Sequence, residues 1–310
     1  MPLAHPAFAN LTLPVIGAPM FLISNPDLVI AQCRAGVIGA FPALNARTTD
    51  ILDDWLSTIG ERTAGHAPFA VNMILHKSNT RLRDDLAVCA RHRVPIVITS
   101  LGAVREVYDA VHAYGGLVLH DVITVRHARK ALAIGADGLI AVCAGAGGHG
   151  GTLSPFALVQ EIRAFFDGPL FVAGSIATGD AVLATQAMGA DGAYVGSLFI
   201  ASQEAAAGDA YKRMMIEATA ADIIYTPAFT GIPGNYLKPS IAAAGLDPDK
   251  LPEGPQQAAD FRKAAEGRKA WKDIFSAGQG VGAIREVAPA AAIVERLNRE
   301  YEAARRRLCD

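Results

Sequence analysis

Residues 138–151 read Gly-Leu-Ile-Ala-Val-Cys-Ala-Gly-Ala-Gly-Gly-His-Gly-Gly, an uninterrupted apolar run that passes into a glycine-rich loop. The apolar part is typical of a strand buried on both faces, and glycines let the backbone after it approach another group closely. His149, the one imidazole among five glycines, can act as a base or a donor near neutral pH. Alone, such a loop is equally compatible with a flexible connection that carries an incidental histidine. The rest of the chain has to decide between these interpretations.

Seven further apolar runs have the same character, and segments with apolar residues three and four apart lie between them, as amphipathic helices require. These runs cover residues 15–18, 37–40, 69–72, 96–99, 117–120, 170–173 and 193–195. Intervening helices are expected over segments such as 27–35, 80–93, 104–113 and 124–134. Eight β-then-α units predict an α/β fold, a (β/α)8 or TIM barrel. A doubly wound open sheet is the competing architecture, disfavoured because the units continue without a large shift in composition.

A short sequence motif that occurs twice supports the repeated β-then-α unit. Residues 133–138, Ala-Ile-Gly-Ala-Asp-Gly, resemble residues 187–192, Ala-Met-Gly-Ala-Asp-Gly. Each places a helix-ending glycine before a strand. Asp137 and Asp191 therefore fall at the end of the barrel opposite the catalytic mouth, and we expect them to be structural.

Beyond the strands the pattern changes, and three regions are predicted. Residues 1–204 form the barrel, residues 205–285 a helical and lid subdomain over the active site, and residues 286–310 a C-terminal helix that packs back on the barrel. Within the second region, residues 226–256 are rich in proline and glycine, which is typical of a lid or of an irregular surface segment. Helices are expected over 205–221, 257–272 and 286–307.

Composition excludes several classes of protein. The chain has 310 residues and a net charge of −2, so a nucleic-acid partner is not expected. It has no apolar window of about 18 residues and no signal-peptide pattern at its N-terminus, which predicts a cytoplasmic protein without membrane contact. Its four cysteines lack the spacing of a disulfide framework or a zinc site, and no metal-binding motif surrounds His149. The Gly-x-Ser-x-Gly elbow of serine hydrolases is also absent from the sequence.

The ends of the last two predicted strands carry a glycine and a serine each, namely Gly174, Ser175, Gly196 and Ser197. Phosphate sites in such barrels often use these two loops, whose N–H groups can hold a dianion without a lysine or arginine. The alternative is that these residues form ordinary turns between strand and helix.

Other strand ends offer further candidates. Asn72 could present an amide donor and acceptor to a flat heterocycle, or could cap the next turn. Met20 could make a soft apolar contact. His120 and Asp121 are adjacent on one strand, so at most one of them is expected to face the site.

Taken in order, these segments resemble the nitronate monooxygenase family, formerly called 2-nitropropane dioxygenases, which are FMN-dependent (β/α)8 enzymes. The resemblance runs from about Leu13 to Ala201. It implies three groups of FMN-binding residues: one lines the flavin ring, two glycines approach the cofactor, and a third group holds its phosphate. It also implies that His149 is the catalytic histidine. The ring set is Ala18, Pro19, Met20 and Asn72, the glycines are Gly147 and Gly148, and the phosphate set is Gly174, Ser175, Gly196 and Ser197.

The resemblance is specific for the flavin barrel and less specific for the substrate. Nitronate-oxidising members carry Gln-Gly-x-Glu-Ala-Gly-Gly-His where residues 142–149 here lack the Gln and the Glu, and related reductases often carry Lys where Asp121 stands. Residues 228–237 look like a feature of a subgroup.

Three functions follow from these residues. The first is FMN-dependent oxidation of a small organic anion, nominally a nitronate, by oxygen. The second is an NAD(P)H-dependent flavin reductase of quinones or enoyl thioesters. The third is a flavin-free phosphate-binding lyase or isomerase. The expected partners are a small-molecule substrate with oxygen or NAD(P)H, and a homodimer is compatible with the sequence.

Overall fold

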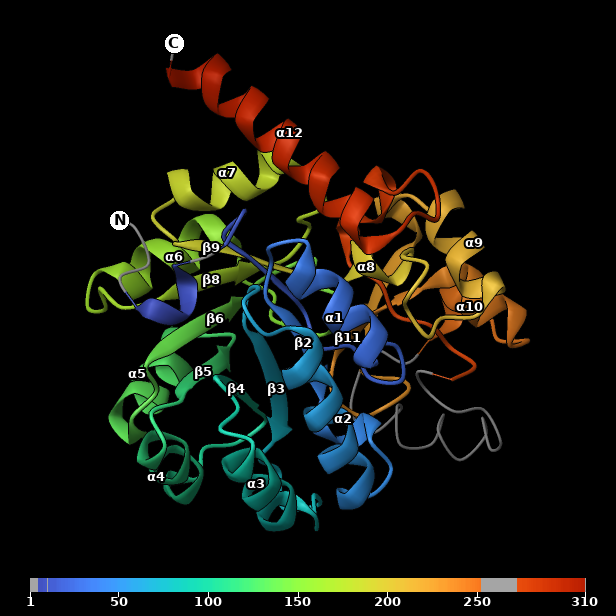
Figure 1. Ribbon diagram of the computed structural model, residues 1–310. Helices are drawn as coiled ribbons and strands as arrows, with labels where there is room; N and C mark the ends of the chain where they lie inside the picture. Colours follow the sequence, from blue (N-terminus) through green and yellow to red (C-terminus); the bar gives the residue numbers. More distant parts are fainter. Residues whose placement is uncertain (1–4, 10, 252–271, 310) are drawn as a thin grey trace.

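The computed structural model describes residues 5–9, 11–251 and 272–309, and its centre is a ring of eight parallel strands (Figure 1). Their order around the ring is β1-β9-β8-β6-β5-β4-β3-β2, and a parallel bridge between Ile16 and Ile38 joins the first strand to the last. The (β/α)8 prediction is therefore confirmed. The strands are β1 (Val15–Gly17), β2 (Gly39–Pro42), β3 (Phe69–Ile74), β4 (Ile96–Ser100), β5 (Leu117–Val122), β6 (Gly138–Val142), β8 (Leu170–Ala173) and β9 (Gly192–Val195).

Helices follow the strands and cover the outside of the ring (Figure 1). Four of them begin at a side chain that accepts a backbone N–H of the first turn, a strong start signal for a helix; these caps are Asn25, Thr48, Thr124 and Thr178. The helices are α1 (Pro26–Arg34), α2 (Thr49–Arg62), α3 (Leu82–Arg91), α4 (Arg105–Ala113), α5 (Val125–Ile134), α6 (Pro155–Arg163), α7 (Gly179–Ala187) and the short α8 (Ser197–Ile200).

The inside of the barrel is filled by one face of every strand. Because side chains alternate along a strand, the buried apolar positions fix which later positions also point inward. The inner layer comprises Ile16, Ile38, Ala40, Ala70, Ile96, Ile98, Leu117, Leu119, Ile140, Val142, Phe171, Ala173 and Tyr194. Continuing this alternation places Asn72, Ser100 and Asp121 inward at the carboxyl ends of β3, β4 and β5. The packing of the core thus directs three polar side chains into the barrel mouth.

The segments after β9 build a cover over that mouth. A three-stranded antiparallel sheet joins β10 (Ile223–Thr226) and β11 (Gly234–Leu237) to β7 (Gly148–His149) in the glycine-rich loop. The predicted irregular stretch that begins at residue 226 thus contains an ordered strand, β11, and starts at the last residue of another, β10; the sequence concealed both because each has only four residues. The remaining helices in the described ranges are α9 (Asp209–Glu217), α10 (Lys238–Ala243) and α12 (Ala290–Cys309). In these ranges, 3-10 turns occur at Pro6–Phe8, Ala43–Asn45, Ala220–Asp222, Pro248–Lys250 and Gln279–Ala283.

Several predicted boundaries shift. The second strand begins two residues later than expected, at Gly39, and the helix expected over 205–221 is confined to Asp209–Glu217. The helix expected over 257–272 falls almost wholly on residues outside the described part of the chain. At the C-terminus, α12 packs against α7, where Glu300 accepts the N–H of Gly179. No helix within the described ranges is both long and apolar enough to cross a membrane.

The motif that occurs twice, at residues 133–138 and 187–192, has a clear structural basis. Gly135 and Gly189 follow α5 and α7 with φ angles of 115° and 102°, the left-handed conformation that glycine favours. The aspartate two residues later then accepts the N–H of the first or second residue of a neighbouring strand: Asp137 from Val118 at 2.7 Å and Asp191 from Leu170 at 2.8 Å. Asp191 also pairs with Arg163 at 2.7 Å. Both aspartates therefore stabilise the end of the barrel opposite the cavity, where the strands begin.

We expect Asp191→Ala to lower the free energy of unfolding by about 2 kcal/mol, because it removes charge-assisted hydrogen bonds from a largely buried site. Urea denaturation measures the change. Asp167→Ala, at an exposed position on the same side of the barrel, is the matched control and should change stability by less than about 0.5 kcal/mol. A loss no larger than in the control would contradict the role assigned to Asp191.

Candidate active site

A cavity of about 810 Å³ lies at the carboxyl ends of the strands, the end at which (β/α)8 enzymes carry their sites. Its volume is in the range of cofactor and substrate sites. All eleven residues predicted from the sequence line it: Ala18, Pro19, Met20, Asn72, Gly147, Gly148, His149, Gly174, Ser175, Gly196 and Ser197. The structure thus brings the candidates together, while their individual roles stay predictions.

One wall of the cavity is the cradle formed by Gly174, Ser175, Gly196 and Ser197, after β8 and β9. Ser175 has a φ of 58°, a strained backbone for a residue with a side chain, and Gly174 a φ of 130°. Such outliers gather at binding sites, where the surrounding structure imposes them. In the ring order, β8 and β9 lie opposite β3 and β4, so the cradle and Asn72 face each other across the mouth.

A second part of this wall comes from residues 276–280, which sequence reasoning missed. Gly278 donates its N–H to Ser197 Oγ at 2.7 Å, and Gln279 donates to the carbonyl of Gly145 at 2.9 Å. A Cβ on Gly147 would lie only 2.8 Å from the Gly278 nitrogen, so this glycine is required by backbone packing. The only signal in the sequence is the pair of glycines that flank Gln279.

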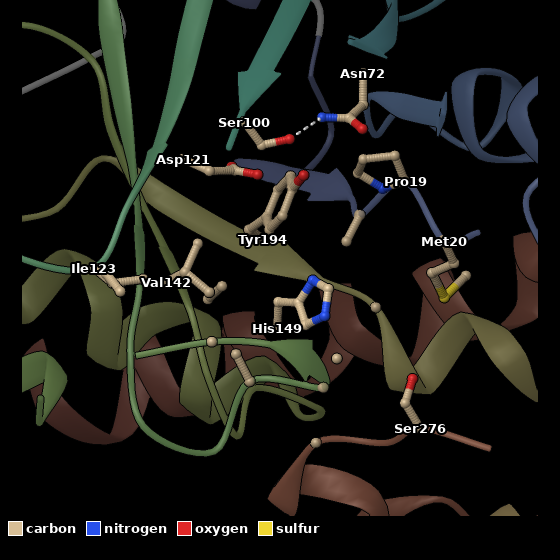
Figure 2. A pocket seen from close by; sticks show the side chains of 18 of the residues that line it. Pro19, Met20, Asn72, Ser100, Asp121, Ile123, Val142, His149, Tyr194 and Ser276 are labelled. Atoms are coloured by element: carbon tan, nitrogen blue, oxygen red, sulfur yellow. Dashed lines mark hydrogen bonds between the residues drawn. The ribbon is translucent and has the colours of Figure 1, made fainter. Parts of the chain in front are cut away.

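The mouth also carries four polar side chains, which we call the floor cluster: Asn72, Ser100 and Asp121 from β3, β4 and β5, and Tyr194 from β9 (Figure 2). Asn72 Nδ2 donates to Ser100 Oγ at 2.9 Å and to the Ile98 carbonyl at 3.2 Å. These bonds fix the amide so that its oxygen and the Ser100 O–H are turned toward other partners. The cluster therefore offers both donors and acceptors to a bound molecule.

His120 and Asp121 point in opposite directions, as their adjacency on β5 requires. The His120 Nδ1 atom lies 2.7 Å from Thr99 Oγ1 and 2.9 Å from the Tyr108 hydroxyl, on the outer face of the strand. Burial lowers the pKa of His120 to about 4, with a smaller effect from the nearby positive charges of His127 and Lys130. His120 is thus a neutral structural residue, and Asp121 is the one that faces the mouth.

His149 sits on β7, and the cover orients its imidazole ring. Its Nε2 atom lies 2.9 Å from Thr230 Oγ1, which is 3.0 Å from the Ile232 carbonyl. Because a carbonyl can only accept, the Thr230 hydroxyl donates to it and accepts from Nε2–H. Nδ1 is then the basic nitrogen. Burial lowers the pKa of His149 below its usual value, so the ring is neutral at pH 7 and can accept a proton.

Two further bonds hold the glycine-rich loop against the cover. The Tyr225 hydroxyl donates to the Gly150 carbonyl at 2.9 Å, and Asn235 Nδ2 donates to the Ala146 carbonyl at 2.7 Å. The sequence marks residues 228–237 as a subgroup feature but contains no sign of a link to His149. In the structure they set its position.

The rim of the cavity is apolar and exposed. Half of the ten exposed large apolar side chains in the described residues line this cavity: Phe21, Leu101, Ile123, Tyr225 and Ile232. Lys130 of α5 adds positive charge on one side, beside His127, whose pKa is lowered by burial. Within the described ranges, no group of three or more metal-ligating side chains is found.

Fold and cavity together define a barrel enzyme with its site at the carboxyl mouth. The nitronate monooxygenase family model matches residues 79–300, more than half of the chain. The protein therefore belongs to the nitronate monooxygenase family.

The relatives of this chain carry names that specify different enzymatic activities. A nitronate monooxygenase from Paraburkholderia phytofirmans is 28% identical, over 93% of this chain and 92% of that protein. A hydroxy-methyl-oxo-octahydroindene-carboxyl-CoA dehydrogenase from Rhodococcus jostii is 26% identical over 72% of this chain. The match spans 62% of that dehydrogenase's length and 64% of another relative's.

Two solved structures resemble this one over nearly the whole chain. FabK from Thermotoga maritima superposes with a TM-score of 0.82 at 27% identity, covering 97% of this chain and 96% of that one. A nitroalkane oxidase from Streptomyces ansochromogenes gives 0.80 at 29% identity, covering 96% and 98%.

We expect Thr230→Val to lower the ratio of the Nε2–H tautomer to the Nδ1–H tautomer of His149 about fivefold, because one net hydrogen bond of about 1 kcal/mol is lost. Nitrogen-15 NMR of the histidine ring measures the tautomer ratio directly. Thr230→Ser, which keeps the hydroxyl, is the control and should behave like the wild type. An unchanged ratio in the valine variant would show that Thr230 does not set the tautomer.

Proposed function

We propose that this protein is an FMN-dependent oxidoreductase that oxidises a small organic anion of the nitronate type, with oxygen as the electron acceptor. The observation that carries the proposal is the placement of a neutral imidazole at the mouth of a cavity whose two sides present a glycine–serine cradle and a polar floor. The name of the nitroalkane oxidase that shares the fold agrees with this chemistry.

The cradle fits a phosphate group. A Cβ added to Gly196 would lie 3.5 Å from the Ala18 Cβ and 3.8 Å from Met20 Sδ, which are ordinary contacts. The protein alone could therefore hold a side chain there, and glycine keeps that part of the cavity open. Backbone N–H groups and serine hydroxyls from Gly174 to Ser197 suit a dianion. Ala18, Pro19 and Met20 offer apolar contact to a flat ring whose polar edge reaches Asn72.

Bound FMN would supply the two-electron chemistry, while the protein binds, orients and moves protons. His149 is the residue placed to do the last of these. With Nε2–H held by Thr230, Nδ1 can take a proton from a substrate carbon or hold the substrate by a hydrogen bond once it is protonated. The apolar rim would exclude water from the carbon skeleton of an organic substrate.

A second candidate is an NAD(P)H-dependent reductase of quinones or enoyl thioesters on the same barrel. The positive charge of Lys130 and the apolar rim would accommodate a larger, anionic substrate. The dehydrogenase from Rhodococcus jostii, whose name specifies a CoA thioester, favours this option.

Two assays separate these functions. Purified protein should show the flavin absorption bands, and aerobic propionate 3-nitronate should yield nitrite. Rapid anaerobic bleaching by NADH or NADPH without nitronate turnover would instead support the reductase. Colourless protein that takes up no added FMN would overturn both.

We expect His149→Asn to reduce turnover by about 10²-fold or more while FMN occupancy is unchanged, because a general base contributes a factor of that size. In the wild type, kcat/KM should rise with pH through a pKa lower than that of an ordinary histidine and then stay level, since burial favours the neutral, basic form. Steady-state kinetics over a pH series measures both effects. His66→Asn, at an exposed position, is the control. Equal losses of turnover and FMN would assign His149 to cofactor packing.

Gly196→Val should reduce FMN affinity at least tenfold and leave the melting temperature of the flavin-free protein unchanged, because the new side chain enters the cavity rather than the core. Fluorescence titration with FMN measures the affinity. Gly208→Val is matched, since a Cβ at Gly208 meets nothing within 4 Å. Undiminished affinity in the Gly196 variant would reject the cradle as the phosphate site.

A further inference from the structure

Asp121 is a polar side chain in the barrel that the proposed chemistry does not use. It lies near the carboxyl end of β5, and its side chain points inward as part of the floor cluster (Figure 2). Its Oδ1 atom is buried and has no hydrogen-bond partner among the described residues. An unpartnered buried carboxyl oxygen is costly, and such groups are retained where they serve a ligand or a reaction. Asp121 therefore points to a function inside the cavity.

The surroundings of Asp121 leave its charge uncompensated. Tyr194 of β9 lies beside it; burial raises the pKa of that phenol, and the Asp121 charge raises it further. His149 of the glycine-rich loop and His127 and Lys130 of α5 line the same cavity. His120 on the same strand also borders it, but its Nδ1 atom is turned to Thr99 and Tyr108. Burial alone raises the pKa of Asp121, to about 7, and no cation among the described residues offsets this effect. The carboxyl group can thus gain or lose a proton near neutral pH.

The ring order places Asp121 where a bound ring would reach. The cradle lies after β8 and β9, and β3, β4 and β5 form the far side of the mouth. A molecule anchored by its phosphate in the cradle must span the mouth to fill the cavity. Its far edge then lies against Asn72, Ser100 and Asp121. Any negative charge added to that ring would repel a carboxylate at Asp121 in a site largely closed to water.

We propose that Asp121 is a proton-coupling residue that takes up one proton from solvent when the ring bound across the mouth is reduced, and releases it when the ring is reoxidised. The inference rests on the proposed function. A hydride from an organic donor, or two electrons and one proton from a reductant, gives the ring one net negative charge. The Asp121 carboxylate then binds one further proton, which neutralises its own charge. On reoxidation the electrons pass to the acceptor, and this proton returns to solvent.

The coupling predicts a particular pH dependence. Reduction raises the pKa of Asp121, because like charges in one site cannot both persist. Between the two pKa values, one additional proton accompanies two electrons, and this adds about 30 mV per pH unit to the slope of the midpoint potential. The wild-type slope should therefore be steeper above pH 7 than the slope of a variant without the carboxyl group.

The test is a spectroscopic redox titration of the FMN-loaded protein from pH 5.5 to 9, with wild type, Asp121→Asn and Asp121→Ser. Asparagine has the shape of the protonated acid, so its potential should coincide with wild type at the acidic end and lie progressively higher above pH 7. The serine variant should also lose the additional slope. Asp109→Asn removes an exposed negative charge on α4 and should leave the wild-type curve unchanged.

The outcomes separate this inference from the proposed function. Parallel curves for wild type and either Asp121 variant would overturn the coupling, with the flavin enzyme intact. A wild-type slope of about 30 mV per pH unit across the whole range would also overturn it, even if neither variant retained FMN. Failure of the wild type to bind FMN would overturn the proposed function itself.

Discussion

Closure of the strand ring is the constraint on which the site depends. The bridge between Ile16 and Ile38 joins β1 to β2, and a closed ring leaves no choice about which strand face is internal. Since side chains alternate, the apolar residues that fill the interior also determine that Asn72, Ser100 and Asp121 point into the mouth. The polar floor is therefore a consequence of core packing. Hydrogen bonds of Asn72 to Ser100 and the Ile98 carbonyl offset part of the cost of burying it, while Asp121 Oδ1 has no partner among the described residues.

The glycine-rich loop connects this rigid ring to the cover. It carries His149, and three separate segments contact it. Ser175 of the cradle lies against Gly145, and Gln279 of residues 276–280 donates to the Gly145 carbonyl. The segment from β10 to β11 contacts the loop through Tyr225, Thr230 and Asn235. Side chains on the loop would prevent the close approach, as the short distance from a Gly147 Cβ to Gly278 shows. Glycine here supports backbone packing and the position of the imidazole as well as access to the cavity.

Local features explain what the sequence could predict. The strand ends and their order follow from apolar runs and helix periodicity, which are properties of neighbouring residues, and they suffice to place all eleven candidates around one cavity. The contacts that were missed are long-range. Thr230 is 81 residues from His149, and Gly278 is 81 residues from Ser197; short polar segments carry no pattern that would specify such pairs. Likewise, His120 and Asp121 are adjacent, and only the strand's register decides which faces inward.

Under the proposed function, the distribution of charge in the cavity favours a bound ring that passes its electrons on readily. Among the described residues that line it, no arginine occurs, and Lys130 on α5 is the one lysine. The cradle would therefore hold a phosphate by backbone dipoles and hydroxyls, which add no net positive charge near the ring. At the far edge, the floor cluster presents Asp121 rather than a cation. Both features disfavour negative charge on a reduced ring, and a ring that is harder to reduce passes its electrons more easily to oxygen or another acceptor. In this cavity, the proton taken up by Asp121 would moderate that penalty during reduction, and its release would restore the penalty for reoxidation.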